Sequence, residues 1–317
     1  MLDLGNIKLT DEDIREIDLA DKLYRSIDLE SFARINEDDL INNRTGLFST
    51  ILASSDIDRL NDIKRVSINR TIREDRTNNR LFSVEELKYP PIKVADKLYY
   101  NRTSYKKQSM FYGGFGHFQA LFENPPNIGD LFTISTWHQK EETQLHFAII
   151  FHDDQLQNLT DMFQNEWNNY LNQLSKLDQK TQIAIRKLFS LITFFFTRPV
   201  NPSKRIEYLF SAFISNKIFE MSCSPKIEAI LYPSVPIGYI ASNIAILPEV
   251  FDSKFDFVKA EEFIVLTKTV GKNQWIYNPI AEATTLTNGK LNWVTSHLNN
   301  EVINHMKLYN VDLDLIK

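Results

Sequence analysis

The chain has 317 residues, of which 43% are hydrophobic and 24% charged, and its formal net charge is −5 at pH 7. This composition is typical of a globular protein with a sizeable core. The negative charge argues against a general nucleic-acid binder, because such proteins neutralise phosphates with Lys and Arg. The single cysteine, Cys223, excludes an intramolecular disulfide. Residues 1–10 also show no basic and apolar leader, so we predict a reducing, cytoplasmic location.

The N-terminal part of the chain, residues 1–60, is acidic and polar with scattered apolar positions. Segments Asp11–Ile17 and Leu19–Phe32 predict short helices within it. We therefore expect residues 1–60 to form a mostly helical N-terminal extension and residues 61–317 to form the main domain.

A basic segment, Lys64–Arg80, lies near the start of the main domain. It holds six basic residues against the acidic pair Glu74 and Asp75. Such a segment suits a pyrophosphate, although a solvated basic surface is the simpler interpretation of the same charges. Farther on, Val84–Leu87 predicts a turn of helix that the prolines after it stop.

Glycines gather after a predicted strand, Met110–Tyr112. The chain has only 9 glycines, and three of them, Gly113, Gly114 and Gly116, lie within one run of four residues. Because glycine permits tight turns and close approach of a backbone, we expect a turn or a ligand contact here. His117–Phe122 then predicts the start of a helix.

The middle of the chain combines two strands with a helical region. Leu131–Trp137 and Gln144–Phe151 are rich in β-forming residues and predict a hairpin with a charged loop. Residues 155–196 and Ile206–Met221 carry apolar residues at helical spacing, so we expect helices in both. The most apolar stretch, Leu188–Phe196, is far shorter than the ~20 residues of a membrane span and predicts core rather than membrane.

The C-terminal part returns to strands. Ile227–Leu231 predicts a buried strand that leads into the sequence Tyr232-Pro233-Ser234. Phe263–Thr269 and Gln274–Tyr277 predict two more strands, and Leu291–Tyr309 predicts a closing helix.

The commonest site motifs are absent from the sequence. It has no GxGxxG after a strand, no P-loop, no HExxH and no GxSxG. His146 and His152 fit a strand face as well as a pair of ligands, and no CxxC accompanies them. We therefore predict no metal site and no required cofactor.

Two blocks of the sequence, in order, resemble the RES domain family, which is named for Arg, Glu and Ser residues. In the family's pattern an Arg precedes a strand that ends in Tyr and a helix that carries Ala and Glu, and a later strand delivers Tyr-Pro-Ser ahead of an Asn. The matching residues are Arg102, Tyr112, Ala120, Glu123, Tyr232-Pro233-Ser234 and Asn243. The family's first arginine corresponds to Arg70, with Arg73 as the alternative, so the resemblance covers residues 70–260 or so.

The sequence departs from the family's pattern in two respects. Arg102-Thr103-Ser104 lacks the Asn that the family often has after this arginine, and the step from Glu123 to Ser234 is longer than in compact members. A helical insertion near residues 155–198 would account for the extra length. The resemblance implies an α+β fold with an ADP-ribosyltransferase-like mixed β core and helical decorations.

The resemblance also implies a pocket that binds NAD as substrate. Cleavage of the nicotinamide–ribose bond builds positive charge on the ribose, which the carboxylate of Glu123 would stabilise. Arg102 and Arg70 would hold the pyrophosphate, since a guanidinium pairs with two oxygens at once. Tyr112 would offer its ring to nicotinamide, and Ser234 would hydrogen-bond the ribose or orient Glu123. The expected catalytic residues are Glu123, Arg102, Tyr112 and Ser234, and the expected NAD-binding residues are Arg70, Arg73, Arg102, Tyr112, Ser234 and Asn243.

The family includes toxins that destroy NAD or transfer ADP-ribose and that a cognate antitoxin protein holds inactive. Three functions therefore stay open for this chain: NAD cleavage by water or inorganic phosphate, mono-ADP-ribosylation of a protein, and a noncatalytic binding role in a RES core that has lost activity. NAD and an antitoxin are the expected partners, and nucleic acid and membrane are not. The sequence is compatible with a monomer or an oligomer.

Overall fold

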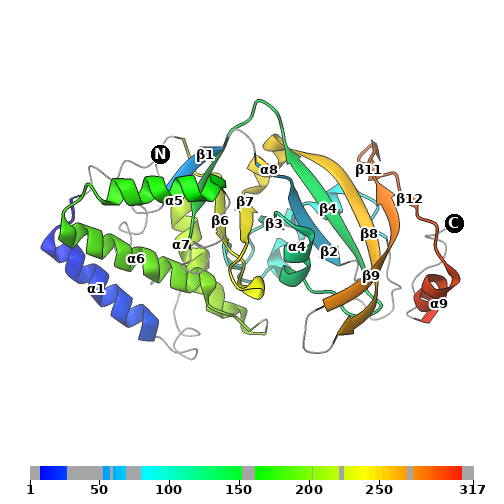
Figure 1. The fold of residues 1–317 in the computed structure, drawn as a ribbon, viewed down its shortest axis with the longest axis horizontal. Coiled ribbons are helices and arrows are strands. Elements are labelled where there is room, and N and C mark those ends of the chain that lie inside the picture. The colour runs from blue at the N-terminus through cyan, green and yellow to red at the C-terminus, as the bar shows by residue number, and fades with distance from the viewer. Residues whose placement is uncertain are drawn as a thin grey trace. The chain divides into compact units, whose positions relative to one another are not determined.

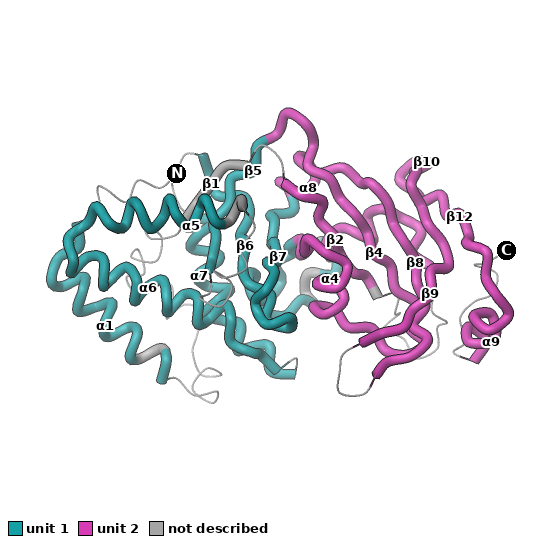
Figure 2. The backbone as a smooth tube through the Cα atoms, viewed as in Figure 1, with its two compact units in different colours: residues 1–58, 91–110, 144–248 teal, residues 59–90, 111–143, 249–317 magenta. Residues whose placement is uncertain are grey.

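In the computed structural model of the chain, the described residues are 8–26, 53–57, 60–68, 80–151, 161–201, 203–220, 225–269 and 274–308. They form a mixed α+β protein with mostly antiparallel strand pairing (Figure 1), so the predicted fold class is confirmed at this level. The chain divides into two compact units, which interleave along the sequence (Figure 2). Unit 1 comprises residues 1–58, 91–110 and 144–248, and unit 2 comprises residues 59–90, 111–143 and 249–317.

Unit 1 contains strands in the order β1-β5-β6-β7. Their bounds are β1 Ala53–Ile57, β5 Leu145–Ile149, β6 Ala229–Pro233 and β7 Ser242–Ile246. β5 and β6 run parallel, with Phe147 opposite Ala229, whereas β1–β5 and β6–β7 are antiparallel. Every residue of β5, β6 and β7 is buried, so both faces of these strands are covered, as the near-continuous apolar runs in their sequences require.

Two of the helices of unit 1, α1 Asp11–Ser26 and α6 Gln179–Thr197, begin with a side-chain capping hydrogen bond. The unit also contains α5 Asp161–Leu174 and α7 Leu209–Phe219, with 3-10 turns η4 Ile92–Lys97, η6 Arg205–Tyr208 and η7 Val235–Ile237. At the start of α1, the Thr10 hydroxyl accepts from Asp13 N at 3.2 Å while the Asp13 carboxylate accepts from Thr10 N at 2.7 Å. The Asp178 carboxylate accepts from Thr181 N at 3.0 Å and starts α6 in the same manner.

Unit 2 contains an antiparallel sheet in the order β3-β2-β4-β8-β9-β12. Its strands are β2 Ile63–Ile68, β3 Phe111–Gly114, β4 Leu131–Gln139, β8 Phe255–Thr269, β9 Gln274–Ala283 and β12 Val294–Thr295, and β10 Leu286–Thr287 pairs separately with β11 Lys290–Leu291. Its helical elements are η3 Val84–Leu87, α4 His117–Glu123, α8 Pro248–Lys254 and α9 Asn300–Leu308.

Two helices of unit 2 pack against its sheet through separate apolar clusters. Ala120 and Leu121 of α4 lie in a cluster with Val66, Phe132, Ile134, Phe263 and Val265. Val302 and Met306 of α9 lie in another cluster with Leu131, Ile264 and Ile280. Because neighbouring residues of a strand point to opposite faces, the alternation of Phe263, Ile264 and Val265 between these clusters places the two helices on opposite faces of the sheet.

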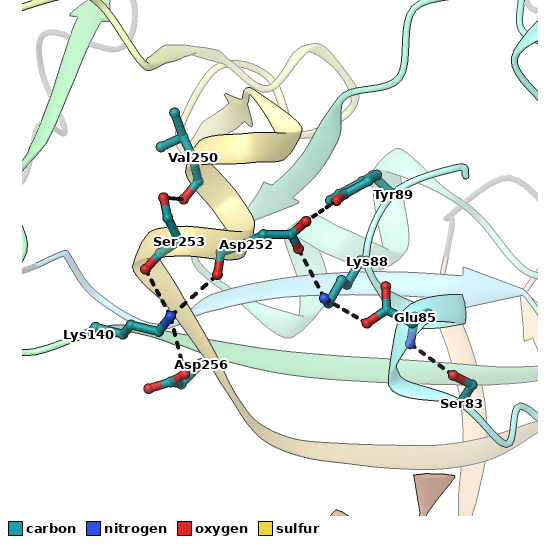
Figure 3. A network of polar contacts seen from close by, with 9 residues as sticks. All are labelled: Ser83, Glu85, Lys88, Tyr89, Lys140, Val250, Asp252, Ser253 and Asp256. Carbon is teal, nitrogen blue, oxygen red and sulfur yellow. Dashed lines mark hydrogen bonds and ion pairs between the residues drawn. The ribbon is translucent and has the colours of Figure 1, made fainter. Parts of the chain in front are cut away.

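A polar network holds α8 within unit 2 (Figure 3). The Asp252 carboxylate accepts from Lys88 Nζ at 3.0 Å and from the hydroxyl of Tyr89, and Lys140 Nζ donates to the carbonyl oxygen of Ser253 at 2.8 Å. Burial raises the pKa of Tyr89, and the hydrogen bond to Asp252 raises it further, so the phenol is a neutral donor. These contacts join α8 to the segment after η3 and to the end of β4.

Several sequence-based expectations about elements need correction. The hairpin predicted between Leu131–Trp137 and Gln144–Phe151 is wrong, because β4 lies between β2 and β8 whereas β5 lies between β1 and β6. The two short helices expected in Asp11–Phe32 are one helix, α1, as far as Ser26. The closing helix begins only at Asn300, after β11 and β12. Within the described part of the chain, no helix is long and apolar enough to cross a membrane.

Candidate functional site

Arg102 caps the C-terminal end of α6 in unit 1. Its Nη1 donates to the carbonyl oxygen of Phe196 at 2.5 Å, and its Nη2 donates to that of Arg198 at 3.4 Å. The last carbonyl groups of a helix lack donors within the helix, and the helix dipole favours a cation beside them. The guanidinium carbon also lies 5.0 Å from the centre of the Tyr208 ring. Arg102 is therefore engaged by the protein itself.

The Tyr232-Pro233-Ser234 segment reaches the same end of α6. The Tyr232 ring lies 5.9 Å from the ring of Phe196, and the hydroxyl of Tyr239 donates to the carbonyl oxygen of Thr197 at 3.3 Å. Arg102 and Tyr232, which are far apart in the sequence, thus both contact Phe196.

Ser234 and Asn243 lie inside unit 1 rather than on its surface. Ser234 is fully buried at the end of β6, where its backbone N–H donates to Ala241 O at 2.8 Å. Asn243 lies opposite Tyr232 in β7 and is 4% exposed. Burial favours a positioning role for Ser234 over direct contact with a ligand.

Tyr112 and Glu123 lie in unit 2, on either side of the glycine-rich turn. Tyr112 is in β3, and its carbonyl oxygen accepts from Arg65 Nη1 at 3.1 Å. Glu123 is the last residue of α4 and is exposed. The predicted set is therefore divided between the units, with Arg102, Ser234 and Asn243 in unit 1 and Tyr112 and Glu123 in unit 2.

The close approach expected at the glycines is present, but the chain itself makes it. A Cβ on Gly113 would lie 2.3 Å from Cγ2 of Ile63, and one on Gly114 would lie 2.7 Å from the side chain of Gln119. Gly116 begins α4 with φ −146°, which is extended backbone open to other residues. The first two glycines are thus explained by packing of β3 on β2 and α4.

A polar cluster that the sequence did not reveal lies beside this turn. His117 Nε2 and Glu261 Oε2 are buried atoms 3.6 Å apart, and neither has a hydrogen-bond partner among the described residues. Lys259 Nζ lies 3.0 Å from the other carboxylate oxygen of Glu261. Burial lowers the pKa of His117, Lys64 and Lys259 lower it further, and Glu261 opposes them.

This cluster is suited to proton transfer. A histidine whose pKa lies below its ordinary value is neutral near neutral pH, and a neutral imidazole can accept a proton. The 3.6 Å separation from Glu261 is longer than a hydrogen bond. His117 was recognisable only as a histidine directly after a glycine-rich turn, and Glu261, in the middle of β8, had no sequence signal.

Three basic residues of the segment Lys64–Arg80 are described, and each is engaged or buried within the protein. Arg80 is 7% exposed and donates through Nε to Glu262 at 2.8 Å, so it is not available to a pyrophosphate. Lys64 Nζ donates to the Thr136 hydroxyl at 3.3 Å, and burial lowers the pKa of Arg65 to about 10. Arg70 and Arg73, the arginines expected to bind the pyrophosphate, lie outside the described residues.

Comparisons with known proteins add no support to the family resemblance, which rests on the motif residues alone. No protein-family model and no curated protein matches this chain. Among the residues that the structure describes, no group of three or more His, Cys, Asp or Glu side chains is arranged to hold a metal ion.

Proposed function

We propose that the chain cleaves the nicotinamide–ribose bond of NAD, with water or inorganic phosphate as the attacking group. The observation that carries the proposal is that Arg102 and Tyr232 of the Tyr-Pro-Ser segment both contact Phe196 at the end of α6, Arg102 at its carbonyl oxygen and Tyr232 at its ring. Arg102 belongs to the first block of the RES resemblance and Tyr-Pro-Ser to the second, and nothing in their local sequence requires both to contact one residue.

In this reaction the carboxylate of Glu123 stabilises the positive charge that develops on the ribose as nicotinamide leaves. Glu123 is exposed at the end of α4, so a ligand can reach it. Tyr112 offers its ring to the nicotinamide, and Ser234 and Asn243 hold the end of β6 and β7 in place.

Arg102 would bind the pyrophosphate of NAD, and to do so its guanidinium would have to change its hydrogen-bond acceptors. Its guanidinium donates to the carbonyl oxygens of Phe196 and Arg198. Binding of a pyrophosphate would replace these neutral acceptors by charged oxygens, and such charge-assisted hydrogen bonds are roughly twice as strong. The same guanidinium therefore supports α6 in the free protein and anchors the substrate in the complex.

His117 is assigned as the base for the reaction with water. Water attacks the ribose carbon, the bond to nicotinamide breaks with its electron pair, and the proton of the attacking water passes to the partly exposed imidazole ring of His117, whose Nε2 stays buried beside Glu261. The lowered pKa of His117 keeps its ring neutral and able to accept that proton. The products are nicotinamide and ADP-ribose.

The test is incubation of the full chain with NAD, with and without inorganic phosphate, followed by separation of the products. Nicotinamide release with free ADP-ribose supports hydrolysis, and ADP-ribose phosphate supports phosphorolysis. Transfer of label to protein would replace cleavage by mono-ADP-ribosylation. Intact NAD under every condition would overturn the proposal and leave a noncatalytic binding role.

Two variants assign the residues. Glu123→Gln keeps the shape but removes the charge, so NAD loss should slow by about 100-fold or more. Glu141→Gln, an exposed glutamate in the loop after β4, is the matched control and should change nothing. His117→Gln should slow the reaction with water by about 100-fold and the reaction with phosphate much less, because phosphate is already ionised.

A further inference from the structure

Unit 1 contains a cavity of about 400 Å³, and none of the residues assigned to NAD cleavage is among its lining residues. It lies among α1, α5, α6 and the end of β5, and Figure 1 shows α6 between α5 and α1. The lining residues are Arg25, Phe151, Trp167, Tyr170, Arg186, Phe189, Ser190, Thr193, Phe194 and Thr197. Ligand pockets have volumes of roughly 300–1,000 Å³, so this one suits a ligand of one or two rings.

One wall of the cavity is aromatic. The Trp167 ring lies 5.0 Å from Phe151 and 5.4 Å from Tyr170, and Tyr170 lies 5.4 Å from Phe189. Ring faces and edges at these separations favour offset or edge-to-face packing of a further ring. The wall therefore favours a flat, apolar body in the ligand.

The hydroxyl of Tyr170 is an unused donor in this wall. Tyr170 is 5% exposed, and its hydroxyl has no hydrogen-bond partner among the described residues. A buried polar group without a partner costs free energy, which an acceptor atom on a ligand would recover. Burial raises the pKa of Tyr170, so the hydroxyl keeps its proton for donation.

The charged side chains among the described lining residues are both positive, Arg25 and Arg186. Arg25 is already paired with Asp21 at 2.7 Å and with the Ser190 hydroxyl at 3.0 Å. Arg186 is exposed at the cavity, and within the described part of the chain no carboxylate forms an ion pair with it. Among the described residues that line the cavity there is no Asp or Glu. An anionic group on the ligand would therefore be attracted, chiefly by Arg186.

We propose that this cavity binds a small aromatic carboxylate. The ring packs against Trp167 and Phe189, and the carboxylate accepts from the Tyr170 hydroxyl and the Arg186 guanidinium. Eight of the lining residues lie in the helical region predicted at residues 155–198, and Arg25 and Phe151 lie outside it. The proposal does not depend on NAD cleavage.

The test is calorimetric titration of the full chain with 2-naphthoate and with its neutral analogue 2-naphthamide. The carboxylate should bind about tenfold more tightly than the amide. Arg186→Gln should remove that preference, while Lys180→Gln, an exposed lysine at the start of the same helix, should preserve it. Equal binding of acid and amide, an unchanged preference in Arg186→Gln, or binding of neither compound would overturn the proposal.

Tyr170→Phe supplies a second, independent readout. It removes the unpartnered hydroxyl, so the free protein should melt at the same or a higher temperature. The affinity for 2-naphthoate should nevertheless fall by about fivefold, because one hydrogen bond to the carboxylate is lost. A lower melting temperature, or an unchanged affinity, would show that the hydroxyl has another partner and would overturn its assignment to the ligand.

Discussion

Arg80 Nη2 and Glu262 Oε2 lie 2.6 Å apart, and both side chains are buried, at 6% and 0% exposure. The ring of Trp293 lies 5.2 Å from the guanidinium carbon of Arg80. This pair joins the end of the predicted basic segment to the middle of β8, and a buried ion pair is costly to break on one side only.

Glu262→Gln should therefore lower the free energy of unfolding by about 3 kcal/mol, because it leaves the buried charge of Arg80 without a partner. Urea denaturation measures the change. Replacing both residues by Met should restore most of the loss, since an apolar pair carries no desolvation cost. Burial raises the pKa of Glu262 and Arg80 opposes that rise, so an unchanged stability in Glu262→Gln would mean that the carboxyl is already neutral.

Gly113→Ala should destabilise the protein by about 1–3 kcal/mol, because the new methyl group would overlap a packed core residue. The added carbon would lie 2.3 Å from Cγ2 of Ile63, which is fully buried, and 3.3 Å from the carbonyl oxygen of Lys64. Gly116→Ala is the matched control, because nothing lies within 4 Å of its added carbon. Thermal melts of the two variants should separate them clearly, and equal melting temperatures would contradict the packing argument.

Stability should depend on pH through His117. Its pKa in the folded protein is lower than the ordinary value of 6.5, because burial and the nearby Lys64 and Lys259 disfavour the charged ring. The unfolded chain therefore takes up this proton at higher pH than the folded protein does. The contribution to stability is complete above about pH 6.5 and is lost progressively as the pH falls toward the lowered pKa.

Urea denaturation at about pH 7.5 and about pH 5.5 measures this dependence. His117→Gln should reduce the difference in unfolding free energy between the two pH values. His297→Gln removes an exposed histidine of the same unit and controls for the loss of an imidazole. If the His117 variant kept the full pH difference, other groups would account for it.

Arg102→Lys should lower the melting temperature although it keeps the positive charge. The guanidinium of Arg102 is a planar group that donates to the carbonyl oxygens of Phe196 and Arg198 and lies over the ring of Tyr208. The ammonium group of a lysine is not planar and cannot make all of these contacts. We expect a loss of about 1–2 kcal/mol. Arg205 is exposed, and its guanidinium donates to the Asn101 side chain at 3.0 Å. Arg205→Lys should therefore cost much less. Equal losses would show that Arg102 does not cap α6.

Local sequence signals were sufficient for most elements. The strand at Met110–Tyr112, the helix from His117 and the helical spacing of residues 155–196 appear as β3, α4, α5 and α6. Apolar periodicity and capping residues act within a few residues of the chain, so they can be recognised without knowledge of the fold.

Pairing and charge burial were decided by distant parts of the chain. β4 and β5 follow one another in sequence, yet each pairs with other strands, because strand order depends on which surfaces pack together. Arg80 belonged by sequence to a basic segment, but Glu262, far along the chain, neutralises it.

For the residues that resemble the RES pattern, too, the sequence determined one part of the description and the tertiary structure the other. The sequence alone identified Arg102 and the Tyr-Pro-Ser motif, because residue type and order can be read from it. Only the tertiary structure showed that both reach the end of α6, that Ser234 is buried, and that His117 faces Glu261. Hydrogen bonding and burial depend on distances between residues far apart in the chain, and those distances exist only once the protein has folded.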